Sequence, residues 1–428
     1  MRTSALLRCA TDWERYLADV RPASRIAAGY ETKALVNQRE HRMVTAGLSW
    51  FGPLGEDATG VAEFASHLIP SLTEIGNVRV WALPRHHRSA RLACLGADCK
   101  DVRTYSESDD YIPVYNIGNS VFHICATQLA LCRPGIIILH DTQLDSLLPH
   151  FSSDRTWCRA GERTPCSTPG GILAELIDRS LAVVVHSRAA ADAVQRLGRP
   201  CELLHLPYDG RLVDASPIAA ASHGMTSQWL PKALGLSSPC NKKSLLIFGH
   251  LGGNRRLNSV IQAISSLPER AHFRLDVYGR GVDSTTRALV RACRLGAIIR
   301  FHGPVSDAVL NAALRRADLG VNLRFPTMGE SSLSQLRFWA HGVPTVCTAT
   351  PNAAHDVHEF VRYVRHDHEV DDLHQVLRDL LAEPRRFAQL GATAKAHVSS
   401  VHCPRSYAQA LWHICRQANA LSRPAGTH

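Results

Sequence analysis

The chain has 428 residues, which is long enough for two or three domains with sizeable hydrophobic cores. Its apolar content of 45% and charged content of 20% are ordinary globular values and exclude global disorder. The formal net charge of +10, with only six lysines among 48 basic residues, favours an anionic partner without selecting its chemical class.

The cysteines and the lengths of the apolar stretches indicate the cellular compartment of the protein. Thirteen cysteines are scattered without a C-x-x-C pair or zinc-ligand spacing, which predicts free, largely buried thiols in a reducing environment. Asp12, Glu14 and Asp19 interrupt any signal-peptide core, and the longest apolar runs are only strand-sized. We expect a cytoplasmic protein, with peripheral contact at the inner face of a membrane left open.

The first half of the chain alternates between strand-like and helix-like segments. Residues 1–41 are polar and arginine-rich, and we expect an N-terminal arm there, either helical or mobile. Short apolar runs follow at 44–50, 78–83, 112–117, 135–140, 181–186 and 201–206, with helix-like segments at 61–74, 121–132 and 188–197. Continuous apolar runs are typical of strands covered on both faces, so residues 42–206 predict a doubly wound α/β domain with a parallel sheet.

The same alternation restarts after a break. Residues 207–243 are rich in Pro, Ser, Ala and Gly and predict a linker region with one helix near 229–234. Strands are then expected at 244–248, 273–278, 298–301, 319–323 and 343–347, and helices at 257–267, 285–295, 307–316, 333–341 and 370–381. A second Rossmann-like domain should therefore span 244–400. A final helical stretch is expected over roughly 384–417, and 401–428 are assigned to a C-terminal helix and tail.

Small and polar residues gather at the predicted carboxyl ends of the first-half strands, where ligands bind in open parallel sheets. Gly52 and Gly60 flank the loop after the first strand, and such a glycine-rich turn admits a phosphate or a sugar. Asn116, Asn119 and His123 follow another strand and are candidates for the acceptor side. His140 ends the next strand and could hydrogen-bond a substrate hydroxyl, although a purely structural histidine is the alternative.

The second half carries more specific candidates. Arg255 and Arg256 lie between glycines and a helix start, where a guanidinium can hold phosphate oxygens bidentately. Glu330, Ser331 and Ser332 precede a helix whose N-terminus can bind phosphate, although a serine there could simply cap the helix. The further candidates at strand or helix ends are His250, Gly279, His302, Gly303 and Leu333.

These residues carry a resemblance to a known family. The second half resembles the nucleotide-binding half of retaining GT-B-fold glycosyltransferases of family 4, also named glycosyl transferases group 1. The resemblance lies in 248–263, in 278–281 with 301–303, and in 326–344, where a Pro-Thr-x-Gly-Glu loop leads to a helix closed by His-Gly-Val-Pro. The first half is similar more loosely, through 52–60, 116–140 and a strand ending in Val-His-Ser. Together the similar segments extend over roughly 43–418.

The resemblance implies a retaining transfer from a UDP- or GDP-sugar to a hydroxyl of a carbohydrate or lipid-linked acceptor, with no metal or other cofactor. It gives His140, Glu330 and Arg255 catalytic positions, next to the sugar, the donor and the diphosphate respectively. Donor-binding positions fall on Gly52, Gly60, His250, Arg256, Gly279, His302, Gly303, Ser331, Ser332, Leu333 and Arg337. Arg337 and His250 depart from the family pattern, which has a ribose-binding glutamate and an arginine at these places.

Other functions fit the residues less well. A catalytically degenerate GT-B-like protein that only binds nucleotide sugars, or acts as a scaffold, is the main alternative, because the ribose glutamate is missing. A phosphorylase would need a cofactor lysine, for which Lys395 is poorly placed. An NAD-dependent oxidoreductase would need a third glycine after Gly279 and Gly281. Nucleic-acid binding is not expected, because aromatics are few and the arginines are dispersed.

Overall fold

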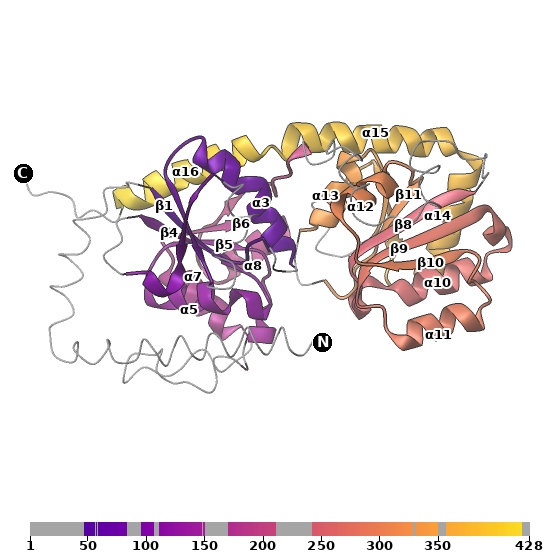
Figure 1. The fold of residues 1–428 in the computed structure, drawn as a ribbon, viewed down its shortest axis with the longest axis horizontal. Helices are drawn as coiled ribbons and strands as arrows, with labels where there is room; N and C mark the ends of the chain where they lie inside the picture. The colour runs from indigo at the N-terminus through magenta and orange to yellow at the C-terminus, as the bar shows by residue number, and fades with distance from the viewer. Residues whose placement is uncertain are drawn as a thin grey trace, which may run out of the picture. The chain divides into compact units, whose positions relative to one another are not determined.

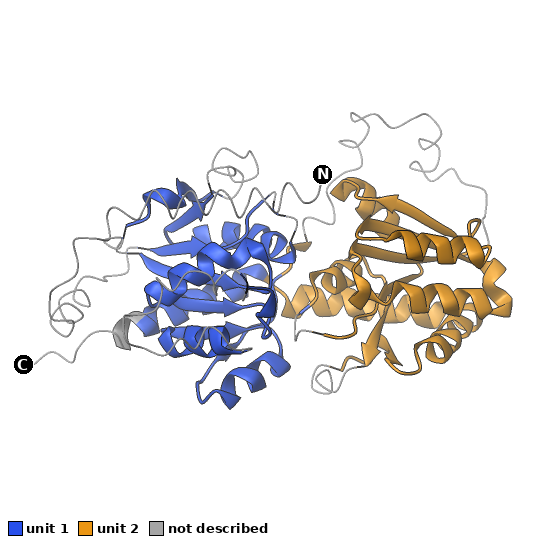
Figure 2. Ribbon diagram, turned by 90° about the horizontal axis from the view of Figure 1, so that it is seen from below, with its two compact units in different colours: residues 1–207, 328–331, 404–428 blue, residues 208–327, 332–403 orange. Residues whose placement is uncertain are grey.

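The computed structural model describes residues 47–55, 57, 59–83, 96–106, 111–147, 149, 170–210, 242–327, 331–349 and 357–421. The chain divides into two compact units (Figure 2). Unit 1 comprises Met1–Pro207, Met328–Ser331 and Pro404–His428, and unit 2 comprises Tyr208–Thr327 and Ser332–Cys403. The predicted N-terminal arm, most of the predicted linker with its helix near 229–234, and Glu330 lie outside the described residues.

Unit 1 is built on a seven-stranded sheet in the order β3-β2-β1-β4-β5-β6-β7, with every neighbouring pair parallel. The central strands are continuous apolar runs, and they are buried because helices cover both faces. The strands are β1 (Leu48–Phe51), β2 (Val78–Ala82), β3 (Asp98–Asp101), β4 (Ile112–Ile117), β5 (Ile136–Leu139), β6 (Ala182–Val185) and β7 (Glu202–Leu203).

Two sets of helices cover this sheet (Figure 1). On one face, α5 (Ile124–Cys132), α7 (Gly171–Arg179) and α8 (Arg188–Arg196) share a core with alternate strand residues such as Tyr115 and Ile137. On the other face, α3 (Gly60–Thr73) stacks Phe64 on Trp50 and packs against α16 (Pro404–Leu421). The C-terminal helix α16 is thereby part of unit 1, and Trp412 fastens it by donating a hydrogen bond to the Leu72 carbonyl at 3.2 Å.

Unit 2 has a six-stranded parallel sheet in the order β10-β9-β8-β11-β12-β13. Its strands are β8 (Lys243–His250), β9 (Phe273–Arg280), β10 (Ile299–Gly303), β11 (Leu319–Asn322), β12 (Thr345–Ala349) and β13 (Val361–Arg365). The helices are α10 (Leu257–Ser266), α11 (Ser284–Ala292), α12 (Asp307–Leu314), α13 (Leu333–Ala340), α14 (Glu369–Ala382) and α15 (Pro384–Val401).

The alternation of side chains along β8 shows how both faces of this sheet are used. Leu245 and Ile247 enter the core shared with α10 and α14, whereas the Phe248 ring lies 4.8 Å from that of Phe338 on α13.

The prediction of two doubly wound parallel α/β halves is confirmed. No helix in the described part of the chain has the length and apolarity needed to span a bilayer.

Four details differ from the sequence expectations. β3 and β13 were not expected, because Asp-Cys-Lys-Asp and Val-Arg-Tyr-Val-Arg are polar edge strands without a continuous apolar run. Helix α7 was also missed. The helical stretch expected over 384–417 is divided at His402 and Cys403, because Pro404 disfavours helical backbone before it and begins α16.

The thiols differ from expectation in their burial. Eight cysteines fall in the described segments, and all are free. Only Cys347 and Cys415 are buried, five are partly exposed and Cys132 is exposed, so the prediction of largely buried thiols is wrong. Three of the partly exposed thiols, Cys125, Cys201 and Cys293, pack against the edges of the two cores.

Candidate functional site

The order of the strands places a topological switch point in each unit. The chain moves outward in opposite directions from β1 and β4 in unit 1, and from β8 and β11 in unit 2. At such a point the loops after the two strands diverge and leave a crevice at the carboxyl edge of the sheet, where ligands of doubly wound folds bind. These two edges are therefore the candidate ligand sites of the two units.

In unit 1, Asn116 at the end of β4 joins three segments. Its Nδ2 donates to the Phe51 carbonyl of β1 at 3.0 Å, and its own backbone carbonyl accepts a hydrogen bond from His123 Nδ1 at 2.9 Å. Its Oδ1 lies 3.1 Å from His140 Nε2. The Asn116 side chain is fully buried, so this set of hydrogen bonds fixes the switch point of unit 1.

The same hydrogen bonds define the state of His140. Because Asn116 uses its amide nitrogen toward Phe51, its oxygen faces His140, and His140 Nε2 must carry the proton. Burial and the neighbouring His186 and His123 hold the pKa of His140 well below its ordinary value. The imidazole is therefore neutral near pH 7, and Nδ1 is a lone-pair acceptor able to receive a hydrogen bond from a hydroxyl.

The loop after β1 passes close to this histidine. A side chain at Gly52 would meet Asn116 Cβ at 2.7 Å, so only glycine allows the loop to lie against Asn116. Gly60 begins α3, and Thr59 caps that helix by accepting a hydrogen bond from Ala62 N at 3.1 Å. Gly52 thus lies next to Asn116, whereas Gly60 is part of a capped helix start.

The remaining acceptor-side candidates are held by their neighbours. Asn119 N donates to Asp141 Oδ2 at 2.7 Å, and Asn119 Oδ1 accepts from Ser146 N at 2.9 Å. His123 is buried, which lowers its pKa to about 4. These residues shape the loops around His140, and the Asp141 carboxylate orders the turn next to it.

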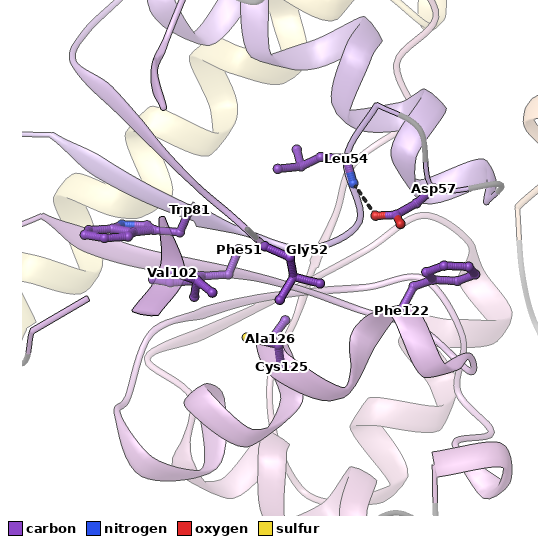
Figure 3. A pocket seen from close by; sticks show the side chains of 10 residues that line it. Phe51, Gly52, Leu54, Asp57, Trp81, Val102, Phe122, Cys125 and Ala126 are labelled. Carbon is purple, nitrogen blue, oxygen red and sulfur yellow. Dashed lines mark hydrogen bonds between the residues drawn. The ribbon is translucent and has the colours of Figure 1, made fainter. Parts of the chain in front are cut away.

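A cavity opens beside Gly52 (Figure 3). With the solvent at its mouth it measures about 370 Å³. Its lining is mostly apolar, and the carboxylate of Asp57 accepts a hydrogen bond from Leu54 N at 3.0 Å. The lining comprises Phe51, Gly52, Leu54, Asp57, Trp81, Leu83, Val102, Phe122, Cys125 and Ala126.

In unit 2, glycines bring two strand ends into contact. A Cβ at Gly279 would lie 1.9 Å from the Gly249 carbonyl oxygen, and both residues have positive φ, 124° and 113°. Gly253 begins the short turn after β8, where a side chain would meet no atom within 4 Å. The carboxyl end of β8 is thus a close-packed backbone with an open, small-residue turn above it.

Arg255 spans the switch point of unit 2. Its Nη1 donates to Asn322 Oδ1 on β11 at 2.9 Å, and its Nη2 donates to the Phe248 carbonyl on β8 at 3.1 Å. The residue is only 5% exposed. Sequence reasoning placed Arg255 at this edge but missed Asn322, whose only signal is its position as the last residue of a strand.

The N-terminus of α13 lies beside this pair. Ser332 caps the helix by accepting from Gln335 N at 3.2 Å, and the same hydroxyl oxygen is 3.2 Å from Asn322 Nδ2 and 3.1 Å from Arg324 Nη2. Arg324 adds a second cation, which was not among the predicted site residues. Leu333 begins α13, and its amide belongs to the first turn, whose N–H groups have no partner within the helix.

Three predicted donor-side residues have strong partners inside unit 2. Arg256, in the left-handed region at φ 52°, donates from Nε to both oxygens of buried Glu369 at 2.9 and 2.8 Å. Arg337 is buried and bonds to Asp307 at 2.8 Å and to Asn311 at 2.7 Å on α12. His302 stacks on Tyr278 and lies 2.8 Å from Asp276 Oδ1.

The carboxylate next to His302 is held ionised by its neighbours. Burial opposes ionisation of Asp276, but hydrogen bonds from His302 and Arg274 outweigh it, so the pKa of Asp276 is lowered. His250 is exposed at the end of β8, and Gly303 ends β10 at positive φ. Among the residues that the structure describes, no group of three or more His, Cys, Asp or Glu side chains could hold a metal ion.

The Ser331 hydroxyl belongs to unit 1 and donates to the His186 carbonyl at 3.0 Å. The loop residue Glu330 next to it cannot be placed, since it lies outside the described residues. Ser331 and Ser332 therefore have different partners: Ser331 bonds to the end of β6, and Ser332 caps α13.

Solved structures with a similar fold are known. HepE of Anabaena, solved in complex with UDP, is similar with a TM-score of 0.64 and 13% identity over 86% of this chain and 100% of that one. The fold is GT-B. A second GT-B structure, sucrose-phosphate synthase of Thermosynechococcus elongatus, has a TM-score of 0.59 and 13% identity over 89% of this chain and 98% of its own.

A third solved structure and a family match add to these similarities. The lipopolysaccharide glycosyltransferase WaaG gives a TM-score of 0.53 at 15% identity, over 85% of this chain and 97% of its own. Residues 242–383, which contain the Arg255 and Ser332 edge, match the family of glycosyl transferases group 1. No curated protein sequence matches the chain significantly. The second half of the GT-B chain is thus similar to the glycosyl transferases group 1 family over these residues.

Proposed function

We propose that this GT-B protein transfers a sugar, a hexose in the first instance, from a UDP- or GDP-linked donor to a hydroxyl acceptor with retention of anomeric configuration. The observation that carries the proposal is the cationic edge of unit 2. Arg255 and Arg324 meet Asn322 and the capped start of α13 there, inside the segment that matches the group 1 family. Solved HepE structures contain UDP and UDP-glucose, which supports a nucleotide-sugar donor.

This edge can stabilise a departing diphosphate. Charge accumulates on the phosphate oxygens as the bond to the sugar breaks, and a preformed set of guanidinium and amide donors stabilises that charge without reorganisation. Arg255 is already fixed by Asn322 and the Phe248 carbonyl, so little side-chain entropy is lost on binding. In a retaining transfer, a donor phosphate oxygen then accepts the proton of the attacking hydroxyl.

His140 would serve the sugar side. It is neutral and offers Nδ1 as an acceptor, so it can receive a hydrogen bond from a sugar hydroxyl and cannot repel the positive charge that develops on the anomeric carbon. Glu330, which resembles the donor-facing glutamate of family 4, supplies a carboxylate for the same sugar. The acceptor would be a carbohydrate or a lipid-linked molecule, and peripheral membrane contact belongs to this part of the proposal.

The test begins with binding. A panel of UDP-, GDP- and ADP-sugars is screened for a rise in melting temperature, since a ligand that binds only the folded chain stabilises it. Sugar transfer from the best donor is then followed for the wild type and for Glu330→Ala, with exposed Glu359→Ala as the matched control. We expect Glu330→Ala to lower turnover by orders of magnitude at unchanged melting temperature, and Glu359→Ala to behave as wild type.

The outcomes separate the parts of the proposal. An inverted anomeric configuration in the product, read by proton NMR, would refute retention while leaving the transfer intact. In another outcome, a donor raises the melting temperature while its sugar is transferred neither to a tested acceptor nor to water. That result would identify a protein that only binds nucleotide sugars. If no nucleotide sugar stabilises the chain, the proposed donor site is wrong.

A further inference from the structure

Three aromatic side chains from three segments of unit 1 form a cluster with His140. The Phe64 ring of α3 lies edge-on at 4.8 Å between centroids, and the His186 ring at the end of β6 lies at 5.1 Å. Tyr407 of the C-terminal helix α16 completes the group, 5.7 Å from both His186 and Phe64. The C-terminal helix therefore contacts the two rings that pack on His140, the histidine that the proposed function places next to the sugar.

His186 is held in one protonation state. Its Nδ1 lies 3.1 Å from the Leu204 carbonyl, which only accepts, so Nδ1 carries the proton and Nε2 is a lone-pair acceptor. Burial lowers its pKa to about 4, and the ring is neutral near pH 7. His186 Nε2 is buried and makes no hydrogen bond to any atom of the described residues.

Tyr407 presents the complementary group. Its hydroxyl is also buried and bonds to no atom in the described segments, and burial raises its pKa well above the usual range. A buried donor and a buried acceptor therefore lie on adjacent rings. Buried polar groups in folded proteins nearly always have partners, and a shared water is the usual one where a direct bond is not made.

We propose that His186 and Tyr407 are positioning residues for His140, joined by a hydrogen bond that runs from the Tyr407 hydroxyl through one buried water to His186 Nε2. The bond fixes the plane of the His186 ring, and His186 with Phe64 then fixes the ring of His140 while Asn116 holds its Nε2. Helix α16 thus contributes to the reaction side of unit 1. The effect on turnover rests on the proposed function, whereas the hydrogen bond itself does not.

The experiment compares two variants of the same helix in the full-length chain. Tyr407→Phe removes only the hydroxyl, and Trp412→Phe removes the α16 hydrogen bond to Leu72, at a different contact of the helix with α3. Histidine ring nitrogens are observed by ¹⁵N NMR in the absence of substrate. In the wild type we expect His186 as the Nδ1–H tautomer with a hydrogen-bonded Nε2, and His140 as the Nε2–H tautomer.

Tyr407→Phe should move the His186 Nε2 resonance to that of a free lone pair and shift or broaden the His140 signals. It should also lower kcat roughly tenfold, the equivalent of one lost hydrogen bond, with KM for the donor unchanged. Trp412→Phe should lower the melting temperature but leave the histidine resonances and kcat as in the wild type. His186→Phe keeps a ring at this site, and on its background Tyr407→Phe should have no further effect.

Each contrary result would overturn one part of the proposal. An unchanged His186 Nε2 resonance in Tyr407→Phe would remove the bridging hydrogen bond. A changed His186 with unchanged His140 signals and kcat would show that the pair has only a packing role, and independent losses in the double variant would do the same. If no sugar is transferred by the wild type, the proposed function fails, yet the NMR comparison still decides whether the pair positions His140.

Discussion

Arg255 donates a hydrogen bond to the Asn322 side chain, 2.9 Å away, at the topological switch point between β8 and β11 of unit 2. Unit 1 has an asparagine at a similar place, since Asn116 is the penultimate residue of β4 and bonds to the end of β1. In unit 1 the asparagine bonds directly to the neighbouring central strand, whereas in unit 2 Arg255 joins Asn322 to the Phe248 carbonyl of β8. In each unit the asparagine side chain contacts the residue predicted to meet the substrate, Arg255 in one unit and His140 in the other.

Replacing Arg255 by Ala should weaken binding of a nucleoside diphosphate by about 1.5–3 kcal/mol, because a hydrogen bond to a charged group is lost. Isothermal titration with UDP and GDP measures this, and thermal melting measures the separate stability cost of the lost buried contacts. Arg256→Ala provides the contrast. Its guanidinium is bound to buried Glu369, so the change should destabilise unit 2 more than it weakens binding. Equal affinities of wild type and Arg255→Ala would remove Arg255 from the donor site.

Gly279→Ala should destabilise unit 2 by about 3 kcal/mol or more, because the new methyl group would overlap the Gly249 carbonyl and the backbone has φ 124°. Gly253→Ala is the matched control, since a methyl group there meets no atom within 4 Å and stability should be unchanged. Urea unfolding of both variants checks the difference. Comparable free energies of unfolding would show that the contact between β8 and β9 is looser than described.

The free energy of unfolding should fall as the pH is lowered from 6.5 to about 4. Burial lowers the pKa of His123, His186 and His341 from 6.5 to about 4, so in this window the unfolded chain binds protons that the folded chain does not. Each such proton contributes about 1.4 kcal/mol per pH unit. Urea unfolding at a series of pH values measures the slope, and a flat profile between pH 6.5 and 4.5 would contradict neutral buried histidines.

The proposed sugar transfer should show no acid limb near pH 6.5 that arises from His140. Burial, His186 and His123 keep the pKa of this imidazole well below its ordinary value, so it stays neutral as the pH falls through 6.5. The pH dependence of kcat for wild type and His140→Asn tests this. We expect a lower rate in the variant without a change in the shape of the profile above pH 6. A limb near 6.5 that vanishes in His140→Asn would mean that His140 titrates normally.

Transfer activity should survive EDTA. No Asp-x-Asp motif stands at a strand end of the sequence, and in the proposed mechanism guanidinium and amide groups take the role that a divalent ion has at diphosphates in other enzymes. Initial rates with EDTA and with added Mg²⁺ or Mn²⁺ should agree within twofold. A twofold change in rate corresponds to a difference of less than about 0.5 kcal/mol in the activation free energy. Loss of activity in EDTA that a metal restores would count against the mechanism.

Much of the candidate site follows from pattern. Glycines, asparagines and histidines after apolar runs mark strand ends, and strand ends of a parallel sheet share one edge, which is how Gly52, Asn116, His140 and Arg255 were found. Asn322 and Arg324 escaped because a single polar residue at a strand end has no spacing to distinguish it. The partners of Arg256 and Arg337 lie 113 and 30 residues away and were equally invisible in sequence.

The sequence alone determined the two α/β halves and most of their helices and strands, because burial on both faces of a sheet requires continuous apolar runs that can be read locally. Only the tertiary structure decided which strands are neighbours, that α16 belongs to unit 1, and which state His140 adopts. Those properties depend on contacts between residues far apart in the chain, such as Tyr407 with His186 and Asn116 with His140. Local periodicity carries no information about such contacts.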